Sequence, residues 1–96
     1  MATAKKHLSY QIKSVDGHIE ITMKGCLDEY SDLVQIARLR GAIYLNLNSV
    51  EAINDVGFLK LIVLLRSLNH RFSFSGYSHA VAERLLALPP ILKGAL

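Results

Sequence analysis

Apolar and polar side chains alternate along two neighbouring stretches near the start of the chain. Residues 8–15 show this alternation, and residues 18–23 repeat it. A period of two places every second side chain on the same face of a β-strand. The dipeptide Asp16-Gly17 separates the two stretches, and such a pair readily adopts the positive φ angles of a two-residue turn. The pattern therefore predicts an N-terminal β-hairpin.

A helical spacing of apolar residues follows, and a largely apolar run comes after it. The helical pattern predicts a short helix over residues 30–40, which Gly41 would end. The polar residues that could cap its start are Asp28, Ser31 and Asp32. Residues 42–47 are mostly apolar, as is typical of a strand buried on both faces. We therefore expect a short helix leading into a central strand.

The second half of the chain repeats the succession of helix and strand. A helix is predicted over residues 55–68. Its apolar residues that share one face are Phe58, Leu61, Ile62, Leu65 and Leu68. Residues 71–75 alternate as a strand, and Ser78 can cap a last helix that Pro89 ends. This order of elements favours right-handed crossovers and a mostly parallel sheet that begins with the antiparallel hairpin.

Composition limits the chain to a single folded domain. Its 96 residues are 51% hydrophobic and 20% charged, so residues 1–96 can build one core, with residues 1–6 expected as a disordered tail. The single cysteine, Cys26, cannot form an internal disulfide, which fits a reducing cytoplasm. The start lacks the apolar segment of a signal peptide, and the longest apolar run, residues 56–65, is too short to span a membrane.

Residues with catalytic or metal-binding patterns are not found. The six glycines do not have the spacing of a phosphate-binding loop or of a dinucleotide-binding motif. The four histidines are scattered and form no zinc-like pair with the lone cysteine. Asp28 and Glu29 could be an acid/base pair, although adjacent carboxylates before a helix are usually a solvated first turn. We therefore predict a protein that is not an enzyme and has no metal or cofactor.

Acidic side chains concentrate in the middle of the chain. In a parallel sheet, the loops that follow the second and third strands emerge at the same edge. The acidic residues expected at that edge are Asp28, Glu29, Asp32, Glu51 and Asp55. Such a rim would repel the phosphates of nucleic acids and would suit a basic or neutral protein partner. The alternative is that these carboxylates only cap the start of two neighbouring helices. The net charge of +3 is too small to indicate a partner.

Three short motifs resemble those of a known family. Residues 25–28, Gly-Cys-Leu-Asp, resemble the G-E-L-D that ends a strand in STAS domains, the fold of bacterial anti-sigma factor antagonists. Residues 42–58 are similar to the family's strand, its D-S-S-G turn and the start of its second helix, and residues 76–81 are similar to the G-x-S-P-A-V at the start of its last helix. The resemblance implies a single α/β STAS-like domain. Its four-stranded mixed sheet would carry about three helices, packed mainly on one face.

The turn before the second helix departs from the family at its polar positions. In the family, a partner kinase phosphorylates the first serine of this turn, and the matching residue here is Asp55. Asn54 replaces the family's aspartate and Val56 its second serine, whereas Gly57 is kept. We therefore do not expect phosphorylation at this turn. Two interpretations of Asp55 remain open, a simple helix cap and a fixed, phosphate-like state.

The outward side of the 55–68 helix is unusually apolar for a small domain. Opposite the predicted core face lies a stripe bordered by Leu59 and Leu64. It consists of Val56, Lys60, Val63 and Ser67. The resemblance to STAS modules implies that a partner protein binds this helix and the turn before it. The alternative is that the chain's own end, with Ile91, Leu92 and Leu96, folds back over the stripe.

These observations predict a protein-interaction module of bacterial signalling and transcription regulation. The partner would be an anti-sigma kinase-like or other regulatory protein. The residues expected to bind it are Asn54, Asp55, Val56, Gly57, Lys60 and Val63. The alternative function is that of an accessory STAS subunit that binds the ATPase of a bacterial lipid ABC transporter. Neither function involves nucleic acid or membrane insertion, and the oligomeric state stays open.

Overall fold

The computed structural model describes residues 7–89. The expected disordered tail, residues 1–6, lies outside the described residues. So do Ile91, Leu92 and Leu96, which were considered as a cover for the second helix.

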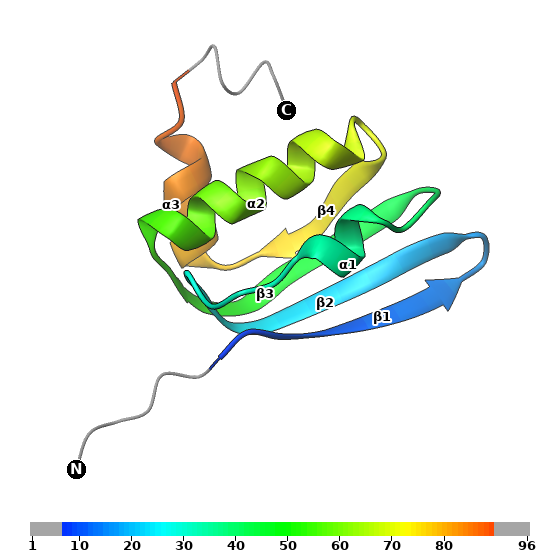
Figure 1. The fold of residues 1–96 in the computed structure, drawn as a ribbon, viewed down its shortest axis with the longest axis horizontal. Coiled ribbons are helices and arrows are strands. Elements are labelled where there is room, and N and C mark those ends of the chain that lie inside the picture. Colours follow the sequence, from blue (N-terminus) through cyan, green and yellow to red (C-terminus); the bar gives the residue numbers. More distant parts are fainter. Residues whose placement is uncertain (1–6, 90–96) are drawn as a thin grey trace.

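Within residues 7–89, a four-stranded mixed sheet carries three helices (Figure 1). The strands lie in the order β1-β2-β3-β4, with β1 antiparallel to β2 and the other pairs parallel. Their bounds are Ser9–Val15 for β1, His18–Leu27 for β2, Ile43–Ile53 for β3 and Phe72–Tyr77 for β4. The helices are α1 (Val34–Ala37), α2 (Asp55–Leu68) and α3 (His79–Leu86). The predicted element order and mixed sheet are confirmed. Figure 1 shows α1 and α2 on the same side of the sheet and α3 beside the start of α2.

Local turn chemistry accounts for the hairpin between β1 and β2. Asp16 and Gly17 have φ angles of 45° and 83°, the positive values that the dipeptide was expected to adopt. Val15 therefore pairs with His18 directly across the turn. The hairpin fixes the register of the first two strands.

The first helix is much shorter than predicted. Instead of spanning residues 30–40, α1 is the single turn Val34–Ala37, and no side chain caps its start. Two candidate caps instead bond to backbone amides two or three residues away. Ser31 Oγ accepts from the Asp28 amide at 3.0 Å, and Asp32 Oδ1 accepts from the Val34 amide at 3.0 Å. Short polar side chains compete with a helix in this way. After α1, Arg71 holds the loop by donating to the carbonyl oxygen of Gly41 at 2.9 Å.

The second helix has the predicted bounds but a different buried face. Leu61, Leu65 and Leu68 are buried as expected. Leu64 was expected beside the outward stripe, yet only 2% of it is exposed, whereas two residues of the predicted core face, Phe58 and Ile62, are only half-buried. The physical reason is that α1 packs against α2 on the Leu64 side, so the buried face is turned toward α1.

Candidate functional site

The candidate site lies where α2 begins, beside the end of β2. The amide of Asn54 donates to the carbonyl oxygen of Leu27 at 3.1 Å, which ties the start of α2 to β2. Gly57 also lies against the backbone of Leu27 at the end of β2. A Cβ atom on Gly57 would lie 2.1 Å from the Leu27 carbonyl oxygen, far inside van der Waals contact. Only glycine therefore lets α2 approach β2 this closely.

Asn54, and not Asp55, is the cap of α2. Its Oδ1 accepts from the amide of Gly57 at 2.8 Å, and its Nδ2 donates to Glu29 Oε1 at 3.2 Å. Both polar atoms of the Asn54 side chain are thus used within the protein. Asp55 is the first helical residue. The side-chain cap bond is thus made by Asn54, whereas Asp55 stands in the first turn, where its charge favours the helix dipole.

The carboxylate of Asp55 is paired with an arginine from α3. Its side chain is 91% exposed, and its Oδ1 lies 2.5 Å from Nη1 of Arg84. Nη2 of Arg84 donates to the carbonyl oxygen of Ile53 at 3.2 Å, and the guanidinium carbon lies 6.0 Å from the centroid of the Phe58 ring. Sequence reasoning missed Arg84. Residues 29 positions apart give no periodic signal, and only the β3–α2–β4–α3 path brings them together.

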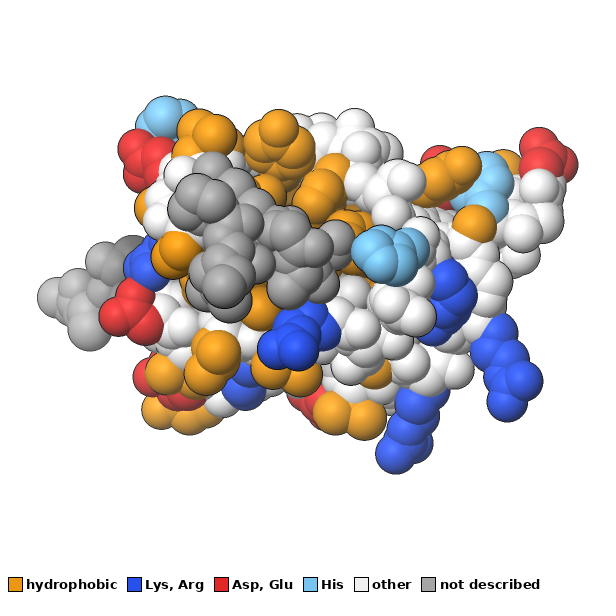
Figure 2. All heavy atoms as spheres, turned by 90° about the horizontal axis from the view of Figure 1, so that it is seen from above, with side chains coloured by type: hydrophobic (Ala, Val, Ile, Leu, Met, Phe, Trp, Pro, Cys, Tyr) orange, Lys and Arg blue, Asp and Glu red, His pale blue; other side chains and the backbone are white. Residues whose placement is uncertain are grey.

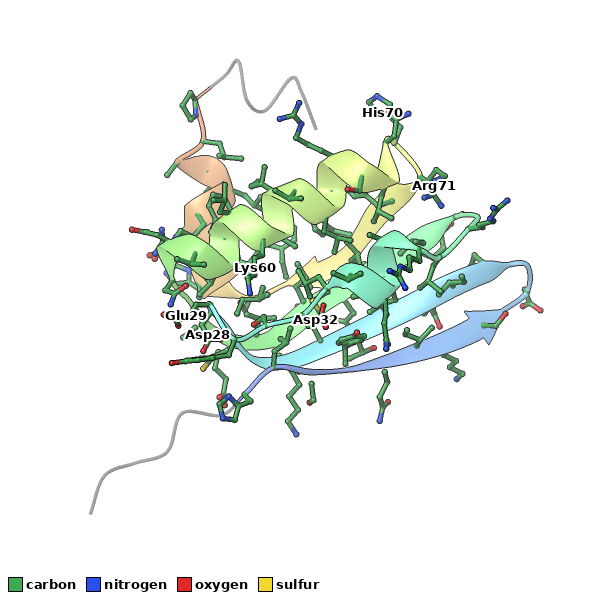
Figure 3. The ribbon with its side chains drawn as sticks, in the orientation of Figure 1. Asp28, Glu29, Asp32, Lys60, His70 and Arg71 are labelled. Atoms are coloured by element: carbon green, nitrogen blue, oxygen red, sulfur yellow. The ribbon has the colours of Figure 1, made fainter. Side chains whose placement is uncertain are left out.

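Lys60 is anchored to the loop between β2 and α1. Its Nζ donates to the carbonyl oxygens of Glu29 and Ser31, both at 2.6 Å. Figure 3 shows Lys60 and Glu29 close to the start of α2, with His70 and Arg71 toward the other end of the helix. The ammonium group therefore joins α2 to this loop, and two of its three N–H groups are engaged.

The predicted acidic rim is smaller than expected. Asp28 is only 2% exposed: its Oδ1 accepts from the Tyr30 amide at 3.0 Å, and its buried Oδ2 has no hydrogen-bond partner among the described residues. The prediction of a solvated turn at Asp28 is thus wrong, because the loop folds inward around this side chain. Glu51 lies within β3, and not in a loop. Glu29 and Asp32 are exposed carboxylates of this edge that form no ion pair with the described residues, although each accepts one hydrogen bond.

An apolar groove of about 620 Å³ runs between α2 and residues 31–37. On α2, it is lined by Val56, Leu59 and Val63, which are 45%, 62% and 59% exposed. The opposite wall includes Val34, which is 54% exposed. Figure 2 looks onto the helical side and shows hydrophobic side chains exposed there. The predicted outward stripe is therefore one wall of a groove whose other wall, from α1, the sequence did not reveal.

Other kinds of site find little support in residues 7–89. No three His, Cys, Asp or Glu side chains in this part of the chain could hold a metal ion together. Cys26 is free and buried. Over the same residues, no helix has the length and apolar character that crossing a bilayer requires.

Comparison with known proteins gives one informative likeness. No protein-family model and no curated protein matches the sequence. The structure resembles the crystal structure of an anti-sigma factor antagonist from Mycobacterium paratuberculosis, with a TM-score of 0.69 and 18% sequence identity. The match covers 98% of this chain and 95% of that one. At this identity the likeness concerns the fold. The chain therefore has the fold of an anti-sigma factor antagonist, as its STAS-like motifs predicted.

Proposed function

We propose that this protein is a non-enzymatic bacterial interaction module of the anti-sigma antagonist type. The observation that carries this proposal is the exposure of three large apolar side chains along one helix, Val56, Leu59 and Val63. Exposed apolar surface of this kind marks interaction sites on small domains. The fold likeness to an anti-sigma factor antagonist supports a regulatory protein as the partner, bound in the cytoplasm.

The six residues expected to bind the partner have different roles in this proposal. Val56 and Val63 are exposed and would contact the partner directly, as would the exposed carboxylate of Asp55. The other three would position the surface. Asn54 caps α2, Gly57 lets it approach β2, and Lys60 fastens it to the loop before α1.

The module would have no phosphorylation switch at this turn. Asp55 supplies one charge and two oxygens where a phosphoserine would supply nearly two charges and three oxygens. Arg84 also neutralises the Asp55 carboxylate. This pairing favours a neutral docking surface over a fixed, phosphate-like state, because an approaching partner meets an ion pair instead of a free anion.

Partner capture from the native cell tests the proposal. Wild-type protein should retain a regulatory protein, and Val63→Asp should lower its capture about tenfold or more, because a charge would be buried against apolar surface. Leu86→Asp is the matched control, since Leu86 is 75% exposed on α3, away from the groove. Equal capture by wild type and Val63→Asp would contradict the proposal. Capture of an ABC-transporter ATPase would establish the alternative function.

A kinase captured in this way allows a second test. Wild-type protein should resist phosphorylation by it at this turn, whereas Asp55→Ser should become a substrate and gain phosphate at residue 55. Residues 54–57 of the wild type carry no hydroxyl group, so the variant decides the test: an Asp55→Ser protein that gains no phosphate would contradict the proposed equivalence of residue 55 with the phosphorylated serine of the family.

A further inference from the structure

The length of the groove suits a helical occupant. Its α2 wall extends from Val56 to Ser67, eleven residues further along the helix. At a rise of 1.5 Å per residue, this wall is about 16 Å long, which corresponds to roughly three turns of a second α-helix. The groove volume of about 620 Å³ provides space for the apolar side chains of such a segment.

The walls offer few backbone partners to an extended peptide. On the α2 wall, main-chain groups bond within the helix. On the other wall, the amides of Val34, Ile36 and Ala37 already donate to Asp32 Oδ1 or to the Leu33 carbonyl oxygen. The polar side chains of the walls are also engaged: Ser67 Oγ donates to the Val63 carbonyl oxygen at 2.9 Å, and Lys60 Nζ donates to the loop carbonyls. An extended segment would leave its own N–H and C=O groups against apolar surface, whereas a helix satisfies them internally.

The two ends of the groove differ in charge. Near the start of α2, the loop carries Asp28, Glu29 and Asp32, and the ammonium of Lys60 is the cation bonded to it. Among residues 7–89, neither Glu29 nor Asp32 has an ion-pair partner, and both are exposed. At the other end, the exposed Arg38 follows α1 directly. The first end is therefore net negative and the second positive.

We propose that this groove binds an amphipathic helix of a partner protein that carries Lys or Arg at the end lying over Glu29 and Asp32. Its apolar face, with side chains at i, i+3 or i+4 and i+7, packs between Val34 and Val63. The charges at the groove ends set the direction of the helix. The inference rests on the proposed function and adds the chemistry of the partner segment.

Selection from a library of random peptides tests the proposal without the native partner. The full-length protein is the bait, and the peptides are long enough for about four helical turns. The enriched peptides should be amphipathic helices with Lys or Arg concentrated near one end. Measured by fluorescence anisotropy, their Kd should rise about tenfold or more with Val63→Asp and with Val34→Asp. Leu86→Asp should leave the Kd unchanged.

Charge variants test the direction of binding. Glu29→Gln with Asp32→Asn should weaken binding about threefold to tenfold at low salt and flatten its salt dependence, because exposed charges act through screened attraction. Asp16→Asn, in the distant hairpin turn, is the control. Moving the basic residues to the opposite end of an enriched peptide should weaken its binding by a similar factor.

Several results would overturn the proposal. One is enrichment of acidic or non-helical peptides, and another is binding that ignores the substitutions of Val34 and Val63. A stable dimer of the wild type that Val63→Asp dissociates would assign the groove to a second copy. If peptides are enriched only when Leu92 is changed to Asp, the groove belongs to the chain's own last residues.

The results also distinguish the inference from the proposed function. If native capture depends on Val63 but the selected peptides are not basic, the inference fails and the proposed function stands. If the peptides bind as described while native capture ignores Val63, the proposed function fails alone.

Discussion

The guanidinium of Arg84 on α3 reaches the carboxylate of Asp55 at the start of α2, with Nη1 2.5 Å from Oδ1. The pair joins two helices that are separated in the chain by β4. Because the Asp55 side chain is 91% exposed, water and salt screen the attraction, and the pair adds little to the stability of the fold.

A double-mutant cycle measures this ion pair. We expect Asp55→Ala, Arg84→Ala and the double variant to give a coupling free energy of about 0.2–1 kcal/mol in urea unfolding at low salt. The coupling should fall when the salt concentration is raised. Arg84→Ala alone should cost more than Asp55→Ala, since it also removes the bond to the Ile53 carbonyl and the contact with Phe58. A coupling free energy that does not change with salt concentration would contradict an exposed ion pair between Asp55 and Arg84.

The close approach of Gly57 to Leu27 predicts a severe effect of one added methyl group. Gly57→Ala should lower the free energy of unfolding by about 3 kcal/mol or more, because its Cβ would meet a backbone carbonyl that cannot move alone. This loss outweighs the better helix propensity of alanine, which is worth roughly 1 kcal/mol. Chemical denaturation of both proteins gives the difference.

Gly76→Ala is the matched control for this substitution. Its Cβ would lie 2.4 Å from Nδ2 of Asn48, a side-chain atom that can rotate away. The loss should therefore stay below about 1.5 kcal/mol. An equal loss of unfolding free energy for the two variants would contradict the argument that the backbone of β2 cannot accommodate a Cβ atom at residue 57.

The cap of α2 predicts a graded series at Asn54. Asn54→Ala should lower the free energy of unfolding by about 0.5–2 kcal/mol, because the Gly57 amide loses its acceptor. Asn54→Ser retains a capping oxygen but not the bond to Glu29, so it should cost less than alanine. Urea unfolding monitored by circular dichroism measures the series. Equal losses for serine and alanine would exclude capping as the dominant role.

The bonds made by Lys60 predict a local effect on the loop before α1. Lys60→Met keeps the aliphatic stem but removes the ammonium group, so the carbonyl oxygens of Glu29 and Ser31 lose their donor. The free energy of unfolding should fall by about 1–2 kcal/mol, less than two full charged bonds would supply, because the freed carbonyls can bond to water. Hydrogen exchange at the Ser31 amide should accelerate. Lys13→Met, at an exposed position of β1, should leave that amide unchanged.

Much of the fold is readable from local sequence pattern. The hairpin turn follows from Asp16-Gly17, since that dipeptide tolerates positive φ angles whatever surrounds it. The bounds of α2 follow from a long apolar periodicity preceded by Asn54 and ended by Asn69, which closes the helix in the left-handed region at a φ of 47°. The exposed Val56 and Val63 follow from the same periodicity. Each of these features depends on neighbours a few residues apart.

The site itself was decided by contacts between distant segments. Sequence alone did not reveal that Asp55 meets Arg84, that Lys60 binds the loop carbonyls, or that Asp28 is buried. Nor did it show that α1 shrinks to one turn and covers Leu64, which turns an apolar stripe into a groove. The Asp55–Arg84 pair and the bond from Lys60 to the Glu29 carbonyl oxygen join residues about thirty positions apart, and the crossovers of the sheet bring them together. Periodicity reports which side of an element is apolar, whereas only packing decides what that side meets.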